Sequence, residues 1–346
     1  HYRTADSLVI WDAQLLYSDV DDTSGKGGYI DLNYIPRRGR LHRFSYDYLD
    51  DQLEINDLGF IRRNDVITYR YTYSRTNSEH PSFRQIIQNL TLSHETNTDD
   101  RVVRSSIYYR NTLVLKNSSQ FTTTVLYRPP QWDDRTTEGN GDYRTDAGGI
   151  FELEYGTDTS KKFSASFAAS VLGEQLGGLT YSAKGGITYK PTDRLSLDLD
   201  FIYRRTDDWL IHLDGSLLGA YDASQWQPSI AAEYFITAKQ QLRFSMQWVG
   251  INANAQNLYS AAADDELIQI TDGVTDPAFD FTISRLTAQL RYRWEIAPLS
   301  DLFIVYTRGS NLPSQPEDHF SQLFKNALTD PVIDRLVVKF RYRIGY

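Results

Sequence analysis

The sequence of 346 residues contains no cysteine and one methionine, and no run of it approaches the roughly 18 apolar residues that a membrane-spanning helix needs. The missing cysteines exclude a disulfide framework and thiolate catalysis. The missing apolar runs exclude a helical membrane protein. A formal net charge of -9 argues against a nucleic-acid partner.

Signatures of catalysis and of cofactor binding are also missing. The sequence has no Gly-x-Ser-x-Gly, no His-Glu-x-x-His and no glycine loop that would cradle a phosphate. A hydrolase needs a nucleophile, a histidine and a third group within hydrogen-bond reach. The histidines fall in no such pattern: His1, His42, His80, His94, His212 and His319. We therefore expect no enzyme activity, no cofactor and no metal site.

Aromatic residues are abundant, with 24 tyrosines, 16 phenylalanines and 6 tryptophans. Such side chains favour β-strands. The mean hydropathy of -0.48 is that of a water-soluble protein, but a barrel that faces lipid on one side and water on the other is equally polar, because every second residue can be charged. The composition favours an all-β chain and does not argue against a membrane.

The clearest alternation, with a period of two, is in residues 335–346. One face is apolar, and the other carries Arg335, Lys339, Arg341 and Arg343. In a soluble sandwich these cations would face solvent, whereas in a barrel they line the lumen. The apolar face resembles the C-terminal assembly signal of bacterial outer-membrane proteins, which ends on an aromatic residue; its members are Phe340, Tyr342, Ile344 and Tyr346. The barrel assembly machinery of the outer membrane is then an expected partner.

The same period predicts about sixteen strands, many of them near the ~10 residues that a tilted spanning strand needs. They are residues 7–17, 28–36, 41–48, 62–74, 83–93, 101–115, 119–128, 146–156, 161–172, 179–190, 194–205, 224–237, 241–253, 280–296, 300–309 and 333–346. The count falls to fourteen if residues 28–48 form a rim hairpin. We predict a single domain, residues 1–346, that is a transmembrane antiparallel β-barrel.

Short turns and mostly longer polar loops alternate between these segments, as in bacterial barrels with short periplasmic turns and long extracellular loops. The expected outer loops are residues 18–27, 49–61, 94–100, 129–145, 173–178, 206–223, 254–279 and 310–332. An even strand count places both termini in the periplasm. Acidic clusters in the loops, at residues 19–22 and 264–266, are either solvated or near divalent cations held by lipopolysaccharide.

Basic residues recur on the face that should point inward. Those we expect to line the lumen are Arg70, Arg104, Arg110, Arg285, Arg291, Arg293, Lys339, Arg341 and Arg343. Either they create a positive field that favours anions, or they pair with carboxylates and hold the wall together. Among them, Arg291, Arg293, Arg341 and Arg343 lie on strands separated by only one other, so we expect their charges to converge.

Aromatic residues near the strand ends fit the girdles that mark membrane interfaces. This set is Trp11, Tyr17, Tyr155, Tyr189, Trp226, Trp248, Trp294 and Tyr346. Trp132 and Trp209 fall in expected outer loops, where a tryptophan either stacks on a sugar or anchors the loop to its own barrel. Membrane lipid and lipopolysaccharide are expected contacts of the barrel.

Several stretches resemble a family of Gram-negative outer-membrane barrels known as a domain of unknown function (5916). They are Asp57–Arg63, Gln247–Ala253, and Arg293–Glu295 leading to Leu302–Tyr306. Longer members of that family carry a carbohydrate-binding module of the family 9 type before the barrel, and residues 1–20 resemble no such module. The resemblance implies the barrel part alone, in an outer membrane, and it implies no activity.

Three hypotheses follow from these patterns. The first is a channel with a basic lumen that favours anions or acidic oligosaccharides, constricted by the loops at 254–279 and 310–332. The second is a closed barrel that conducts little and serves as an anchor or scaffold for a periplasmic or surface protein. The third, a soluble β-sandwich or propeller, requires the apolar faces to be buried against another sheet.

Overall fold

The computed structural model describes the whole chain except residues 55–62, 262–265, 272, 274–276, 313–318 and 345–346. Sixteen strands have nine residues or more: β2 (Val9–Val20), β3 (Thr23–Arg37), β4 (Arg40–Leu49), β5 (Val66–Asn77), β6 (Gln85–Thr96), β7 (Val102–Val114), β8 (Gln120–Arg128), β11 (Gly148–Gly156), β12 (Phe163–Gly173), β13 (Leu179–Thr192), β14 (Leu195–Asp214), β15 (Leu217–Thr237), β16 (Gln240–Ala261), β18 (Phe281–Ala297), β19 (Ser300–Leu312) and β20 (Ile333–Arg341). The short elements are β1 (Tyr2–Arg3), β9 (Gln131–Asp133), β10 (Tyr143–Thr145), β17 (Leu267–Gln269), one turn of 3-10 helix (Pro277–Phe279) and the helix α1 (Phe320–Thr329).

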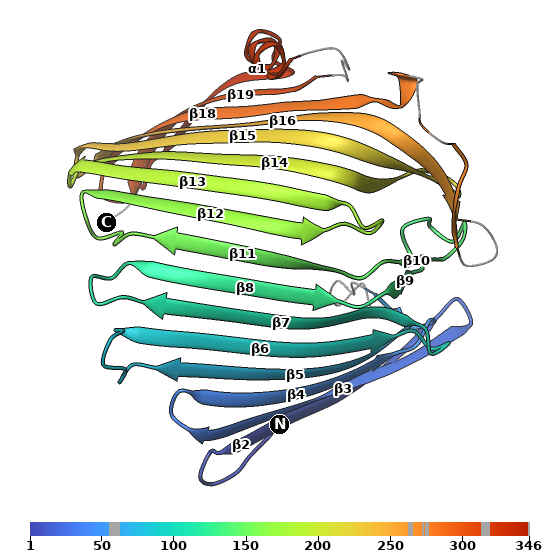
Figure 1. The fold of residues 1–346 in the computed structure, drawn as a ribbon. Helices are drawn as coiled ribbons and strands as arrows, with labels where there is room; N and C mark the ends of the chain where they lie inside the picture. Colours follow the sequence, from blue (N-terminus) through green and yellow to red (C-terminus); the bar gives the residue numbers. More distant parts are fainter. Residues whose placement is uncertain (55–62, 262–265, 272, 274–276, 313–318, 345–346) are drawn as a thin grey trace.

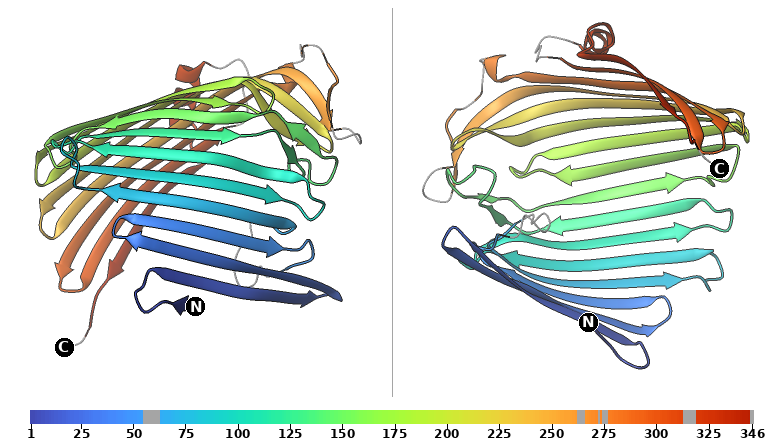
Figure 2. Two further views of the ribbon diagram at one scale, coloured as in Figure 1. Left: turned by 60° about the horizontal axis from the view of Figure 1, so that its bottom comes forward. Right: turned by 180° about the vertical axis from the view of Figure 1, so that it is seen from behind.

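Each long strand pairs antiparallel with the next long strand, from β2 to β20. The sheet curls on itself, so that β18–β20 run behind the β4–β8 wall in the left view of Figure 2. The all-β architecture expected from the alternation is thus confirmed. Within the described residues no pairing joins β20 to β2, and β1 pairs with β2 only at Trp11 and Ile10.

Successive side chains of each strand point to opposite faces of the sheet. One face carries large apolar side chains that remain exposed, such as Phe167, Leu199 and Leu290, at 57%, 49% and 40%. So much exposed apolar surface, repeated on strand after strand, requires an apolar solvent. This face contacts lipid, and the soluble-sandwich hypothesis is excluded because no second sheet covers it in the described part of the chain.

The opposite face is polar and concave. Glu152 on β11 and Lys184 on β13 approach to 2.8 Å across β12, where their ladder partners are the small Ser170 and Ala168. Arg110 on β7 likewise lies 3.6 Å from Glu154 on β11, across β8. Strands two apart are separated by about 9.6 Å, so their long side chains meet most readily where the sheet curves toward them. The polar face therefore lines the lumen.

Two expected outer loops are strands instead. Residues 18–27 form the end of a hairpin whose turn is at Asp21 and Asp22, with φ of 51° and 63°. Residues 206–223 extend β14 and β15 to a tight turn at Gly215, with register shifts beyond Thr206. The apolar–polar alternation that served to predict the strands is required only where one face of the strand contacts lipid. Beyond that level both faces meet water or protein, so a strand no longer needs a period of two.

Helix α1 packs on the outward face of the sheet, over β16 and β18. Its Leu323 and Ala327 are buried, at 1% and 0% exposed, and they contact Trp248 and Leu286. Trp248 donates to the Ser284 hydroxyl (3.1 Å), which donates to the Leu323 carbonyl (3.0 Å).

This packing corrects two expectations. Trp248 is covered by α1 (4% exposed) rather than facing the interface as a girdle residue. The helix in the 310–332 connection lies outside the barrel, so it does not constrict the bore. None of the described helices is both long enough and apolar enough to cross a membrane.

Candidate functional site

The connection between β8 and β11, residues 129–147, reaches across the end of the barrel; we call it the crossing segment. Near its start, Asp134 accepts two hydrogen bonds from Arg63, at 2.8 and 2.5 Å, just before β5. Near its end, the fully buried Tyr143 packs on Leu218 and Ala261 of β15 and β16. Four strands, β11 to β14, separate β8 from β15 in the sheet, so the segment bridges distant parts of the wall.

The end of the crossing segment approaches the backbone of β16 closely. At Gly141, φ is +127°, and a Cβ there would lie 2.4 Å from the carbonyl oxygen of Ala261. Only glycine combines this left-handed backbone with such an approach. In Figure 1 the long strands β15 and β16 bend toward β9 and β10, which belong to the crossing segment. Residues 129–147 therefore join two distant parts of the wall at this end of the barrel.

A polar cleft of about 490 Å³ lies between the crossing segment, the residues before β5, the end of β6 and the start of β7. Its charged and aromatic lining residues are Arg63, Glu95, Arg104, Trp132, Asp133, Asp134 and Arg135. Arg135 donates to the Asn64 carbonyl and side chain, both at 3.2 Å. Arg104 forms no ion pair within the described residues, so its guanidinium is available in the cleft.

Trp132 is held among cations. The Arg101 guanidinium lies 4.7 Å from the centre of its ring and that of Arg144 lies 5.9 Å away, both within cation–π range. Arg101 also pairs with Asp142 at 2.9 Å. The two expectations for Trp132 were stacking on a sugar and anchoring of its loop, and these contacts within the protein fit the second. Trp209 is likewise an anchor, since it packs with Tyr221 and Phe281 in an apolar cluster.

The Arg63–Asp134 pair is nearly enclosed, with side chains 13% and 10% exposed. Burial by itself would raise the pKa of Asp134, but the hydrogen bonds and charge of Arg63 outweigh it and hold that pKa below its ordinary value. Burial would lower the pKa of Arg63, and the Asp134 carboxylate reverses that, so its pKa is raised. Both groups are therefore ionised over the ordinary pH range.

The register places all the strand cations expected in the lumen on the inward face, and three of them are paired. Arg70 lies 3.4 Å from Glu95, Arg110 lies 3.6 Å from Glu154, and Arg293 lies 3.0 Å from Asp301. These pairs connect neighbouring or next-neighbouring strands. The wall-stabilising hypothesis therefore describes part of this set.

The other expected cations have no carboxylate partner within the described part of the chain. Arg285 donates to Asn311 and Arg291 to Gln289, each at 3.0 Å. Lys339 and Arg341 are exposed on β20, and Arg343 follows that strand, with its backbone N–H bound to the Ser300 hydroxyl at 3.0 Å.

Four of these positions share one region near the short turns. Arg293 and Lys339 are both opposite Phe303 in the ladder, Arg341 is opposite Asp301, and Arg291 is opposite Arg243. We call Arg243, Arg291, Arg293, Lys339 and Arg341 the basic row. Arg343, expected to converge with them, lies beyond the last described strand residue.

The expected assembly signal is on the lipid-facing side of β20 and just beyond it. Phe340, Tyr342 and Ile344 are 60%, 57% and 91% exposed, and the rings of Phe340 and Tyr342 stack at 5.9 Å. Tyr346 lies outside the described residues, as do residues 57–62 of the first stretch that carries the family resemblance.

Sequence reasoning missed the cleft. Arg63, Asp134 and Arg135 were assigned to no site, because an interaction across 71 residues leaves no periodic trace. The signal that could have drawn attention is the dense run Gln131–Arg135, with one tryptophan, two aspartates and one arginine. Among the described residues no group of three His, Cys, Asp or Glu side chains could hold a metal ion.

Comparison with known proteins bears out the family resemblance. The family described as "Domain of unknown function (DUF5916)" matches residues 2–346. No curated protein matches the sequence.

Outer-membrane proteins are among the similar solved structures. One is a loop L8 deletion mutant of OmpT from Vibrio cholerae, with 12% identity, TM-score 0.38, and coverage of 88% of this chain and 95% of that one. Another is the siderophore receptor PirA from Acinetobacter baumannii, with 8% identity, TM-score 0.41, and coverage of 98% and 69%. The ferric enterobactin receptor PfeA has 9% identity and TM-score 0.42, over 84% of this chain and 58% of that one. The lipid-facing apolar surface of the chain itself places it in the outer membrane.

Proposed function

We propose, for a chain that belongs to the family described as a domain of unknown function (DUF5916), that it forms an outer-membrane channel that prefers anions. The observation that carries the proposal is the set of inward cations that form no ion pair within the described residues. Arg104 is in the cleft at one end, and Arg291, Lys339 and Arg341 are in the basic row near the other. Charge focused between low-dielectric walls acts over the whole bore.

The two groups of cations would act in sequence. A solute entering beside the crossing segment meets the cleft lined by Arg104, Arg135 and Trp132. A solute leaving at the short-turn end passes the basic row. This order suits small anions or acidic oligosaccharides, because carboxylates bind guanidinium groups while a sugar ring can lie against an indole.

Planar-bilayer conductance tests the proposal, with the reversal potential in a salt gradient as the measure of ion preference. We expect anion-selective steps, and we expect the double variant Lys339→Glu/Arg341→Glu to shift the reversal potential toward cation preference. The matched control is Arg110→Gln/Glu154→Gln, which removes one ion pair and leaves the net charge of the lumen unchanged. An unselective channel, or equal shifts in both variants, would refute the role of the basic row.

A second function, the non-conducting scaffold, is favoured by the crossing segment, which spans the mouth and is anchored on both sides. It predicts silent bilayers from correctly folded protein and a protein that co-purifies from membranes. Removing residues 136–140 from the crossing segment separates the two cases. A plugged barrel should begin to conduct, whereas an open channel should only change its conductance.

A further inference from the structure

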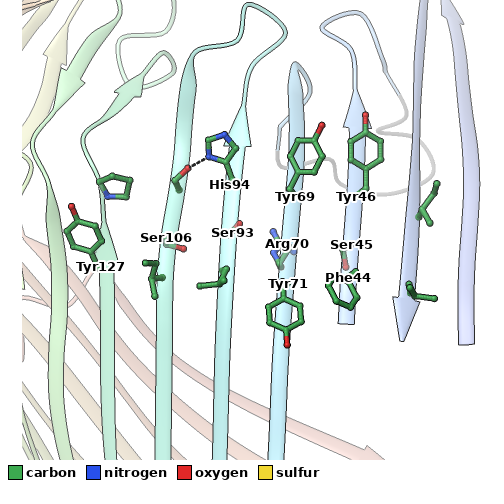
Figure 3. A pocket seen from close by; sticks show the side chains of 16 residues that line it. Phe44, Ser45, Tyr46, Tyr69, Arg70, Tyr71, Ser93, His94, Ser106 and Tyr127 are labelled. Atoms are coloured by element: carbon green, nitrogen blue, oxygen red, sulfur yellow. Dashed lines mark hydrogen bonds between the residues drawn. The ribbon is translucent and has the colours of Figure 1, made fainter. Parts of the chain in front are cut away.

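A groove of about 780 Å³ lies on the lipid-facing side of the sheet between β4 and β8 (Figure 3). Tyr46 and Tyr69 stand on one side of it and Tyr127 on the other, while His94 and Ser105 lie between them. Ser105 is small and 7% exposed, so the bottom of the groove lies below the aromatic rings on its two sides. The outer surface of the barrel is hollowed here.

The groove is polar at one end and apolar at the other. The row nearest the long connections pairs Tyr46 with Tyr69, Tyr69 with His94, and His94 with Ser105, and the His94 Nδ1 lies 2.8 Å from the Ser105 hydroxyl. Two residues deeper, the row consists of Phe44, Tyr71, Leu92, Ile107 and Tyr127. Polar atoms thus face one end, and hydrocarbon fills the rest.

The Tyr71 hydroxyl does not interrupt this apolar stretch. It is bound to His42 Nδ1 at 2.9 Å, on the side away from the groove's polar end. Arg70, between Tyr69 and Tyr71 in sequence, belongs to the inward face and pairs with Glu95. No cation therefore reaches the outward side of the groove from β5.

The depth of the polar row matches the interface of a bilayer. Tyr46, Tyr69 and Ser105 are each three residues from the end of their strand, which is about 10 Å at the rise of a β-strand. Aromatic residues with polar tips are favoured at that level of a membrane. The ester carbonyls of lipids lie there, and they accept hydrogen bonds from hydroxyl and imidazole N–H groups.

We propose that this groove is a binding site for one lipid of the surrounding bilayer. The lipid's ester carbonyls accept from Tyr46, Tyr69 and the His94–Ser105 pair, and its acyl chains lie over Leu92 and Ile107 between the tyrosine walls. The site is continuous with the lipid-facing surface, so its occupant comes from the bilayer. Among the described lining residues the one Lys or Arg is Arg70, whose side chain lies on the inward face with Glu95, so binding depends on acyl and ester contacts and is indifferent to headgroup charge.

In this proposal the His94–Ser105 pair hydrogen-bonds a lipid carbonyl and takes no part in hydrolysis. In a catalytic triad a third group orients the histidine, and within the described residues His94 contacts no carboxylate. The proposal concerns lipid retention, and it stands or fails independently of conduction through the lumen.

Photo-crosslinking tests the site. The full chain is reconstituted in phosphatidylcholine vesicles that contain a small fraction of phosphatidylcholine with a diazirine on one acyl chain, irradiated, digested and analysed by mass spectrometry. We expect labelling, normalised to outward apolar area, to be several-fold higher on β5–β8 than on β11–β13. Even labelling around the barrel would overturn the proposal.

A pair of variants supplies the control. Tyr69→Ala/Tyr127→Ala removes a wall on each side and should reduce the labelling of β5–β8 to the level of β11–β13. Tyr181→Ala/Tyr189→Ala removes two equally outward tyrosines of β13, 48% and 46% exposed, and should leave the β5–β8 labelling unchanged. Replacing phosphatidylcholine by phosphatidylglycerol should preserve the pattern, and a pattern that depends on headgroup charge would contradict the proposed recognition.

Discussion

Arg63 and Asp134, 71 residues apart, face each other through two hydrogen bonds of 2.8 and 2.5 Å. One residue precedes β5, and the other belongs to the crossing segment. The pair is bidentate and largely enclosed by protein, an arrangement in which geometry as well as charge holds the partner. It attaches one end of the crossing segment to the wall, and Tyr143 attaches the other.

Breaking the pair should release that end of the crossing segment. We expect Arg63→Gln to weaken its attachment by about 3 kcal/mol, because a nearly buried carboxylate loses its partner. Limited proteolysis of residues 135–140 in detergent measures the release. The double variant Arg63→Gln/Asp134→Asn leaves no unpaired charge and should be cut more slowly than the single variant. Equal rates would show that the unpaired charge does not matter.

The attachment should also respond to acid. Because the folded pKa of Asp134 is below its ordinary value of 3.8, its contribution is fully present above that value and is lost as the pH falls through the lower, folded pKa. Proteolysis of the crossing segment should therefore stay slow down to about pH 4 and rise only below it. In Asp134→Asn the acid-dependent rise should be absent. A transition near neutral pH would contradict this assignment.

The attachment of helix α1 to the sheet should depend on its two buried residues, Leu323 and Ala327. Ala327 is fully buried in an apolar contact with Trp248 and Leu286, so Ala327→Asp places a charge among apolar side chains and should detach the helix, at a cost of several kcal/mol. In a chain whose other five tryptophans are replaced by phenylalanine, the fluorescence of Trp248 reports the change, since exposing its ring to lipid allows quenching by brominated acyl chains. The exposed Ser321→Asp is the control and should leave the fluorescence unchanged.

The free edges of β2 and β20 should pair in the membrane. Hydrocarbon offers no partner to unpaired N–H and C=O groups, and the two edges run antiparallel because sixteen long strands precede closure. Outward Leu15 and Val338, 92% and 61% exposed, and inward Asp12 and Arg341 would match in such a ladder.

Pairs of introduced cysteines test whether β2 and β20 pair. The chain has no native cysteine that could form competing disulfides. We expect Leu15→Cys to form a disulfide with a cysteine at one of Leu336, Val338 or Phe340 in membranes, since ladder neighbours have the required Cα separation. Leu15→Cys with Phe167→Cys is the negative control. Failure of all three pairs in correctly folded protein would show that the edges remain apart.

Much of the fold was predictable because lipid and water impose their pattern locally. The alternation in the predicted strands 280–296 and 333–346 placed β18 and β20 and assigned their faces, including the inward side of Arg291 and Lys339. The prediction was wrong where that constraint ends, as in residues 206–223, which continue as strands beyond the lipid. It was also wrong for Trp248, whose outward direction was right but whose cover, α1, comes from 70 residues further on.

The sequence alone determined the strands, their two faces and the inward side of the cations, since each depends on a residue and its neighbours at a spacing of two. Only the tertiary structure decided which cations are paired, which connection crosses the mouth and where the outer surface is hollow. Arg70 pairs with Glu95 on the next strand, and Arg104, directly opposite Glu95 in the ladder, forms no ion pair within the described residues, because register and curvature decide which side chains meet. Arg63 and Asp134, 71 residues apart in sequence, meet only because the sheet curls, and no local pattern encodes such a contact.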